Sequence, residues 1–288
     1  MSIPYVQSGN VLKLPELFPE NYFKFTMGSP PYLTARDYGR DDIALTLEPW
    51  VQFMIASTKA ALQVTNGIVL WVCAGVGSEK YQPGPECLIA DLTRHCESWC
   101  EVLRPAIWAK NAPPTGSKWF SNDREYCLAL TKPGAERTWN PEALEELLKY
   151  TNGGSFRQRR KDGTRSAGSA YPTHRYRKRP SNVTWADFDH QADDKWDGNL
   201  HYVPVGGGLL GWKDSHLNEA PYPENLVSRF LKTVTNPGDT VLDPFCGSGT
   251  TVDVSFQLGR VGYGVDIRDS QSDLTKRRLR EMHNIVVP

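Results

Sequence analysis

The order of apolar and polar positions divides the first part of the chain into short apolar runs and longer periodic segments. The short runs carry aromatic or β-branched side chains, as buried strands do, whereas the longer segments repeat apolar positions at helical spacing. Strands are predicted at residues 2–6, 22–27, 67–73, 105–110 and 126–132. Helices are predicted at residues 43–65 and 85–103. This alternation predicts an α/β fold with a mainly parallel sheet.

The alternation stops near residue 132 and resumes after about residue 215. The later elements are predicted as helices 223–234, 249–259 and 270–283 and as strands 239–243 and 261–266. The residues between are rich in Gly, Pro, Arg and Asp and show no regular period. We therefore predict one α/β domain formed by residues 1–131 and 216–288, divided by an irregular insert of residues 132–215.

The insert separates its charges along the sequence. Residues 157–179 contain nine Arg or Lys and one Asp, with aromatic side chains between them, and residues 187–197 contain five Asp and one Lys. Basic side chains neutralise phosphates and aromatic rings stack on bases, so the first segment favours a nucleic-acid surface. A solvated or disordered loop whose two halves pair with each other fits the same composition.

Composition narrows the class of protein. The formal net charge is zero, which argues against a protein that is basic over its whole surface and leaves room for a local basic face. The first 20 residues show no secretory signal, and no apolar run approaches the roughly 20 residues that span a membrane. We therefore expect a cytoplasmic protein whose six Cys stay reduced.

A cluster of thiols raises the question of a metal site. His95 and Cys96 are followed by Cys100, and Cys87 lies upstream. The spacing differs from the common zinc-binding pairs, and the segment is predicted to be helical. We expect buried thiols here and no metal site.

The segment Ser29-Pro30-Pro31-Tyr32 follows a predicted strand. Two adjacent prolines fix two φ angles and remove two backbone donors, so the segment ends the strand, holds a rigid shape and keeps its carbonyls as acceptors. The ring of Tyr32 then lies beside those carbonyls. Taken alone, the pattern also describes a simple proline turn covered by a Tyr.

The stretch VLDPFCGSGTT, residues 241–251, is the most specific motif in the chain. A predicted strand ends at Asp243, and a glycine-rich turn leads into a helix. Glycines allow unusual φ angles and let a ligand lie against the backbone. This strand–turn–helix is typical of the nucleotide-binding corner of a doubly wound sheet. Asp266 ends the next strand, where an acidic side chain can bind both ribose hydroxyls of an adenosine group.

Two other nucleotide-binding motifs fit less well. A nicotinamide site would have a third glycine where this chain has Val252, and the Gly-Lys-Ser/Thr of a P-loop is missing. An ordinary turn between a strand and a helix, without a ligand, is the other interpretation of this segment.

Together the two motifs resemble the amino-methylating DNA methyltransferases, which use S-adenosylmethionine and are common in prokaryotic or phage restriction-modification systems. The family's catalytic motif is (Asp/Asn/Ser)-Pro-Pro-(Tyr/Phe), and its cofactor motif is Phe-x-Gly-x-Gly. Here the catalytic motif precedes the insert and the cofactor motif follows it. That order resembles the circularly permuted β group, whose Rossmann-like sheet carries an inserted target-recognition region.

Smaller matches agree with this resemblance. Residues 8–14 lie where the β group has Gly-Asp near the adenine, and Asn10 replaces that Asp. Residues 219–226 resemble the segment that closes over the methionine end of the cofactor. His216 lies further upstream than the family pattern places it, and Lys110 with Asn111 follows a strand near the expected cleft; their roles stay open.

The resemblance implies a set of site residues. The implied catalytic residues are Ser29, Pro30, Pro31 and Tyr32. The implied cofactor-binding residues are Asn10, Asp243, Phe245, Gly247, Ser248, Gly249, Thr250 and Asp266. The basic side chains expected to bind double-stranded DNA are Arg157, Arg159, Arg160, Arg175, Arg177, Lys178 and Arg179.

The expected reaction is methylation of the exocyclic N4 of a flipped cytosine, because a Ser at the first motif position is commoner among cytosine-N4 enzymes. Adenine-N6 methylation is the nearest alternative, and an inactive DNA-binding protein of this fold or a nicotinamide oxidoreductase is more remote. Carbon-5 methylation would need a Cys nucleophile in a Pro-Cys pair, and the chain contains no such dipeptide. A cognate restriction endonuclease is a candidate partner, and the oligomeric state stays open.

Overall fold

A computed structural model gives the fold of the chain. It describes residues 3–33, 46–76, 81–109, 124–144, 155–156, 160–164, 169–170, 183–184, 212–218 and 221–287. Among these residues, no helix is both long and apolar enough to cross a membrane.

A nine-stranded mixed sheet forms the centre of the fold, with the strand order β1-β11-β10-β2-β3-β6-β5-β9 and β4 paired to β6. Its strands are β1 (Tyr5–Ser8), β2 (Phe23–Gly28), β3 (Thr65–Cys73), β4 (Glu101–Val102), β5 (Ala106–Ala109), β6 (Arg124–Thr131), β9 (Val183–Thr184), β10 (Thr240–Asp243) and β11 (Val261–Asp266). The neighbouring strands from β1 to β3 are all parallel. The predicted α/β class and the mainly parallel central sheet are confirmed.

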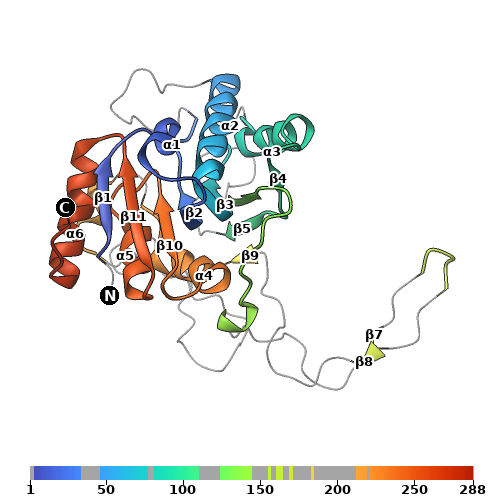
Figure 1. Cartoon of the computed structure of the whole chain (residues 1–288). Coiled ribbons are helices and arrows are strands. Elements are labelled where there is room, and N and C mark those ends of the chain that lie inside the picture. Colours follow the sequence, from blue (N-terminus) through green and yellow to red (C-terminus); the bar gives the residue numbers. More distant parts are fainter. Residues whose placement is uncertain are drawn as a thin grey trace, which may run out of the picture.

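Helices cover both faces of the sheet (Figure 1). The longer ones are α2 (Leu47–Val64), α3 (Gly84–His95), α4 (Glu224–Val234), α5 (Thr250–Gln257) and α6 (Asp269–His283), and the short α1 spans Leu14–Leu17. The single-turn elements are η1 (Val11–Lys13), η3 (Pro141–Leu144) and η4 (Ser215–Leu217). Helices α2 and α3 lie over one face, and α4 and α5 lie over the other.

The two faces follow from alternation along the strands. In β3, Val69 and Trp71 join the core under α2 and α3, whereas Leu70 and Val72 join the core under α4. All four side chains are at most 3% exposed, so this strand is buried on both faces, as its continuous apolar run predicts.

The sheet changes direction of winding between β10 and β2. Strand β2 leads through α2 to β3 on one side, and β10 leads through α5 to β11 on the other. Loops leaving the carboxyl ends of β2 and β10 therefore diverge, and open α/β sheets bind their ligands in the crevice formed at such a point.

One predicted helix was too long. The segment 85–103 forms a helix only as far as His95, and Cys96 caps it. Cys96 and Cys100 are buried in a turn that leads into β4, so their apolar spacing reflects core packing and not a continued helix. Apolar residues at helical spacing beyond His95 therefore do not by themselves continue the backbone hydrogen bonds of the helix.

The insert contributes to the described structure in short pieces. Val183–Thr184 form β9, which pairs in parallel with β5 and extends the edge of the main sheet. Ser155–Phe156 and Ser169–Ala170 form a separate antiparallel pair, β7 and β8. At least one piece of the insert is thus part of the main sheet.

Candidate functional site

A cavity of about 230 Å³ lies at the carboxyl ends of the parallel strands. Its walls come from the loops that follow β1, β2, β10 and β11, together with Phe53 from α2 and the segment around Asn218. Parallel strands place all their carboxyl ends at one edge, so segments more than 200 residues apart meet here. Nine predicted site residues line the cavity: Asn10, Ser29, Pro30, Pro31, Phe245, Gly247, Ser248, Thr250 and Asp266.

The turn after β10 requires glycine at two positions. Gly247 has φ +50° and Gly249 has φ +81°, in the left-handed region that side chains disfavour. A Cβ at Gly247 would lie 2.5 Å from the side-chain nitrogen of Asn218. A Cβ at Gly249 would lie 2.6 Å from the methyl carbon of Thr275. The glycines let the turn pack closely against two other segments and bring its backbone into the cavity wall.

Asp266 joins two of the loops. Its carboxylate accepts the Gly247 backbone N–H and the Arg268 backbone N–H, each at 3.0 Å. Asp266 as a whole is 7% exposed, and it lines the cavity. These bonds hold an acidic group in the wall of the cavity, at the position where the sequence predicts a ribose-binding carboxylate.

Asp243 lies behind the cavity wall. Its carboxylate accepts hydrogen bonds from the Tyr222 hydroxyl at 2.8 Å and from the Phe245 backbone N–H at 3.0 Å. Tyr222 also contacts the Thr251 hydroxyl. Burial raises the pKa of Asp243 from 3.8 to about 6, although these hydrogen bonds act in the opposite direction. Asp243 is therefore outside the cavity lining, and its carboxylate holds the hydroxyl of Tyr222, which lines the cavity.

This buried carboxylate predicts a pH dependence of stability. Its folded pKa exceeds the unfolded value, so the native state holds the proton longer and ionisation of Asp243 opposes folding as the pH rises from 4 to 6. Relative to the unchanged protein, Asp243→Asn should gain up to about 3 kcal/mol of unfolding free energy across this range, then level off. Urea denaturation at several pH values measures the difference. An equal difference at pH 4 and pH 7 would contradict it, and the exposed Asp273→Asn is the control.

The Ser29-Pro30-Pro31-Tyr32 segment begins where β2 ends, as predicted. The Ser29 hydroxyl can donate to the Val72 carbonyl at 3.2 Å or to the Tyr32 hydroxyl at 3.4 Å, and in either case its oxygen can still accept hydrogen bonds. The buried Trp50 indole donates to the Pro31 carbonyl at 2.7 Å. Neighbouring secondary structure therefore fixes both ends of the Pro-Pro unit.

Tyr32 is oriented by a residue that the sequence analysis missed. The Tyr32 hydroxyl donates to the Glu125 carboxylate at 2.6 Å, and Glu125 is 5% exposed on β6. Burial, followed by the negative charge of Glu125, raises the pKa of Tyr32 well above its usual value, so the hydroxyl keeps its proton. Tyr32 lies outside the cavity lining, directly beside Ser29, which lines it.

Two further predicted residues have structural contacts. The Asn10 side chain accepts the Leu12 backbone N–H at 2.9 Å and caps η1, while Asn10 itself lines the cavity. Gly249 lies outside the lining, and its backbone N–H donates to the Cys246 carbonyl at 2.7 Å. Asn10 and Gly249 thus both shape the loops of the site.

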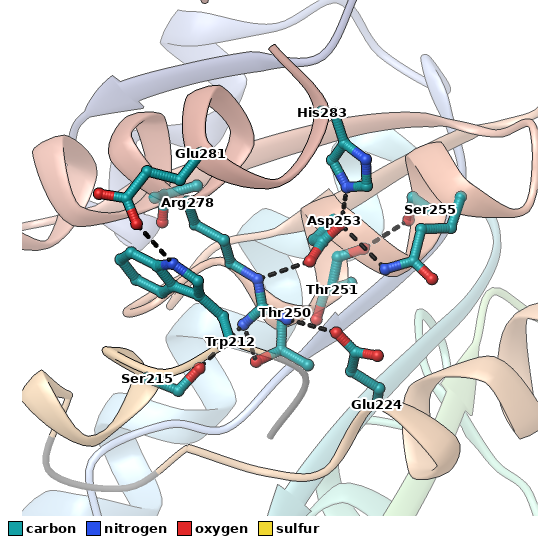
Figure 2. A network of polar contacts seen from close by, with 12 residues as sticks. Trp212, Ser215, Glu224, Thr250, Thr251, Asp253, Ser255, Arg278, Glu281 and His283 are labelled. Atoms are coloured by element: carbon teal, nitrogen blue, oxygen red, sulfur yellow. Dashed lines mark hydrogen bonds and ion pairs between the residues drawn. The ribbon is translucent and has the colours of Figure 1, made fainter. Parts of the chain in front are cut away.

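A buried arginine lies at the centre of a network of polar contacts beside the cavity (Figure 2). Arg278 on α6 has no exposed surface and donates to Asp253 at 2.6 Å and to Glu224 at 2.6 Å. The same guanidinium donates to the hydroxyls of Ser215 and Thr250, each at 3.2 Å. It therefore links α6, α5, the start of α4 and η4, the segment that continues to Asn218.

Burial and the charge of Arg278 shift the pKa values of the two carboxylates of this network, Glu224 and Asp253, in opposite directions. Burial raises the pKa of Glu224 and outweighs the attraction of Arg278. For Asp253, burial acts in the same direction, but Arg278 and the hydrogen bond with His283 outweigh it and hold the pKa below its usual value. The pKa values of the two carboxylates that share Arg278 are thus shifted in opposite directions.

Several residues singled out in the sequence lie outside the described structure or away from the cavity. The residues Lys110, Asn111, Arg157, Arg159, Arg175, Arg177, Lys178 and Arg179 lie outside the described residues. Arg160 is exposed in a tight turn, where its backbone N–H donates to the Thr164 carbonyl. His216 is exposed on η4, its ring Nδ1 lies 2.8 Å from the Lys213 carbonyl oxygen, and it does not line the cavity.

The thiols are all free, and every one except the half-buried Cys87 is buried. Burial raises the pKa of Cys100 to about 12. Among the residues that the structure describes, no group of three or more His, Cys, Asp or Glu side chains is placed to hold a metal ion.

Comparison with known proteins gives a consistent result. The family model N6_N4_Mtase, described as DNA methylase, matches residues 23–277. The type II methyltransferase M.HpaI of Haemophilus parainfluenzae is 25% identical over 276 residues, which cover 96% of this chain and 74% of that protein.

Two solved structures share the fold. A DNA modification methylase from Thermus thermophilus, TTHA0409, crystallised with S-adenosyl-L-methionine, matches with a TM-score of 0.59 and 20% identity over 99% of this chain and 97% of the other. The PvuII DNA methyltransferase, described as cytosine-N4-specific, matches with a TM-score of 0.63 and 14% identity over 96% of this chain and 86% of the other.

Proposed function

Because the chain belongs to the N6/N4 DNA methylase family, we propose that it methylates the exocyclic N4 of a cytosine flipped out of duplex DNA. The observation that supports this most is the meeting of Ser29-Pro30-Pro31 and the turn at Phe245 and Gly247 on one cavity. A methyl donor held by the second segment would lie next to acceptors on the first. The Ser in the first motif position favours cytosine over adenine.

The cavity fits S-adenosylmethionine, the cofactor of this family. It combines apolar walls that include Val11, Leu12 and Phe245 with an acidic side chain, Asp266. A flat adenine needs an apolar slot, and ribose hydroxyls need an acceptor at its edge. When bound, the cofactor supplies a methyl group on a positively charged sulfur that leaves as a neutral thioether.

The chain's own residues would activate the amine. An exocyclic amine is a weak nucleophile because its lone pair is delocalised into the ring. The Ser29 hydroxyl oxygen and the Pro30 carbonyl would accept hydrogen bonds from its two N–H groups, favour a pyramidal nitrogen and direct its lone pair. Tyr32 would stack on the flipped ring and offset part of the few kcal/mol that extrusion costs. The nitrogen would release one proton to solvent after methyl transfer, and positioning and fixed dipoles would carry the catalysis.

The cofactor-binding residues would divide their tasks along the cavity. Asp266 would bind the ribose hydroxyls, and Asn10 would lie near the adenine. Phe245, Gly247, Ser248, Gly249 and Thr250 would surround the methionine side, with Asp243 acting through Tyr222. The catalytic strand precedes the cofactor strand in sequence, which is the order of the permuted β group.

Nucleoside analysis tests the proposed base. Mixed-sequence DNA is incubated with the protein and S-adenosylmethionine, hydrolysed and examined by mass spectrometry. We expect N4-methylcytosine. N6-methyladenine as the sole product would establish the alternative specificity, and an absence of methyl transfer would favour an inactive DNA-binding protein.

The insert 132–215 is proposed as the target-recognition region, with its basic segment on DNA phosphates. Replacing Arg175, Arg177 and Arg179 by Gln should flatten the salt dependence of DNA binding, by up to roughly 0.9 in log–log slope for each lost phosphate contact. Binding titrations between low and moderate salt measure the slope. An unchanged slope would mean that these arginines do not contact the DNA.

A cognate restriction endonuclease that recognises the same DNA sequence is proposed as a partner.

A further inference from the structure

Glu125 is a buried carboxylate beside the catalytic motif, and nothing in the proposed reaction uses it directly. It is the second residue of β6 and is 5% exposed. Removing a carboxylate from water costs free energy unless hydrogen bonds compensate. Its bond from the Tyr32 hydroxyl, at 2.6 Å, has the short length of a charge-assisted hydrogen bond.

This contact fixes the far end of the Tyr32 ring. The backbone of Tyr32 is held by the preceding prolines, and the Pro31 carbonyl is bound by Trp50. The ring packs against the core under α2 while its hydroxyl is anchored to β6. With both ends fixed, rotation of the ring about its two side-chain torsions is restricted. A Phe would supply the same ring without this anchor.

We propose that Glu125 is a positioning residue that acts through the Tyr32 hydroxyl and fixes the plane of the ring on which the target base stacks. The inference rests on the proposed function. A base that stacks on a freely rotating ring samples many orientations of its amine, whereas a fixed ring presents the amine to Ser29 and Pro30 in one orientation. Misplacement of about 1 Å can cost on the order of 10²-fold in rate.

The test compares Glu125→Ala, Glu125→Gln, Tyr32→Phe and the double variant Glu125→Ala/Tyr32→Phe. Transfer of tritiated methyl from S-adenosylmethionine to plasmid DNA gives kcat and the KM for the cofactor. We expect Glu125→Ala to lower kcat by roughly 10- to 100-fold with the cofactor KM nearly unchanged. Glu125→Gln keeps an acceptor oxygen and should restore most of kcat. The double variant should be no slower than the slower single variant.

Tyr126→Phe is a matched control, because it also removes a Tyr–Glu hydrogen bond, to Glu86 at 3.0 Å, from the residue that follows Glu125 on the same strand. It should leave kcat within about 2-fold of the unchanged enzyme. If Glu125→Ala does not fold, the other two single variants decide. A lower kcat in Tyr32→Phe together with a nearly unchanged kcat in Glu125→Gln would support the proposal.

Three results would overturn the proposal: an unchanged kcat in Glu125→Ala, losses that add in the double variant, or an equal loss in Tyr126→Phe. Failure of the proposed function gives a different pattern, because the unchanged protein itself would then transfer no methyl group to DNA or would methylate only adenine N6.

Discussion

Ser29→Ala should lower kcat for methyl transfer by about 10²- to 10³-fold while leaving the Kd for S-adenosylmethionine nearly unchanged. The variant removes an acceptor whose contribution is largest when the amine becomes pyramidal, and removing one such group from a preorganised site costs about this much. The serine proton is directed to a protein oxygen, the Val72 carbonyl at 3.2 Å or the Tyr32 hydroxyl at 3.4 Å, so the lost group is an acceptor for the substrate. Steady-state kinetics measures kcat, and isothermal titration measures the Kd for S-adenosylmethionine.

The control for this prediction is Ser29→Asn, which keeps an acceptor oxygen of a kind found in the family's motif. It should retain more activity than Ser29→Ala. An equal loss of cofactor affinity and of rate in Ser29→Ala would contradict the assigned role, because it would place Ser29 in cofactor binding. An unchanged rate would remove Ser29 from the reaction.

Arg278→Met should destabilise the fold by about 3–5 kcal/mol, the usual cost of removing one partner of a buried ion pair. Arg278 and Asp253 have fully buried side chains, and Glu224 shares the same guanidinium. In the variant, the carboxylates of Asp253 and Glu224 would lose the positive charge that compensates their burial. Domains of this kind have roughly 5–15 kcal/mol of total stability, so a large share would be lost. Urea denaturation at neutral pH measures the change.

Arg277→Met is the matched control, because the neighbouring Arg277 pairs with Glu281 and Asp214 at the surface. Solvent screens such pairs, so we expect a much smaller loss. A double variant, Arg278→Met with Asp253→Leu, removes both buried charges and should recover part of the stability. Equal losses in Arg277→Met and Arg278→Met would show that the buried network contributes no more than a surface pair.

The sequence predicted most of the fold because the central strands and their helices have strong periodicity. Nine of the twelve implied catalytic and cofactor residues line one cavity, since both motifs are local and both follow parallel strands. The helix predicted at 85–103 failed beyond His95, because Cys96 and Cys100 are apolar for packing reasons in a turn.

The missed residues act through contacts that are distant in sequence. Glu125 meets Tyr32 across 93 positions, and Tyr222 meets Asp243 across 21. Arg278 did offer a signal: it lies four residues after Leu274, on the apolar face of the last helix, where a charge needs a partner. Its partner Asp253 is 25 positions away, and only the fold brings the two together.

The most direct test of the whole account is modified-base sequencing of plasmid DNA from a methylation-deficient host that expresses this protein. Base identity and sequence context are obtained together, and Ser29→Ala serves as the inactive comparison. We predict N4-methylcytosine at one recurring sequence in the plasmid from the unchanged protein, with little or none from the variant. Unmodified DNA, or methyl groups found only on adenine N6, would contradict the proposed cytosine-N4 activity.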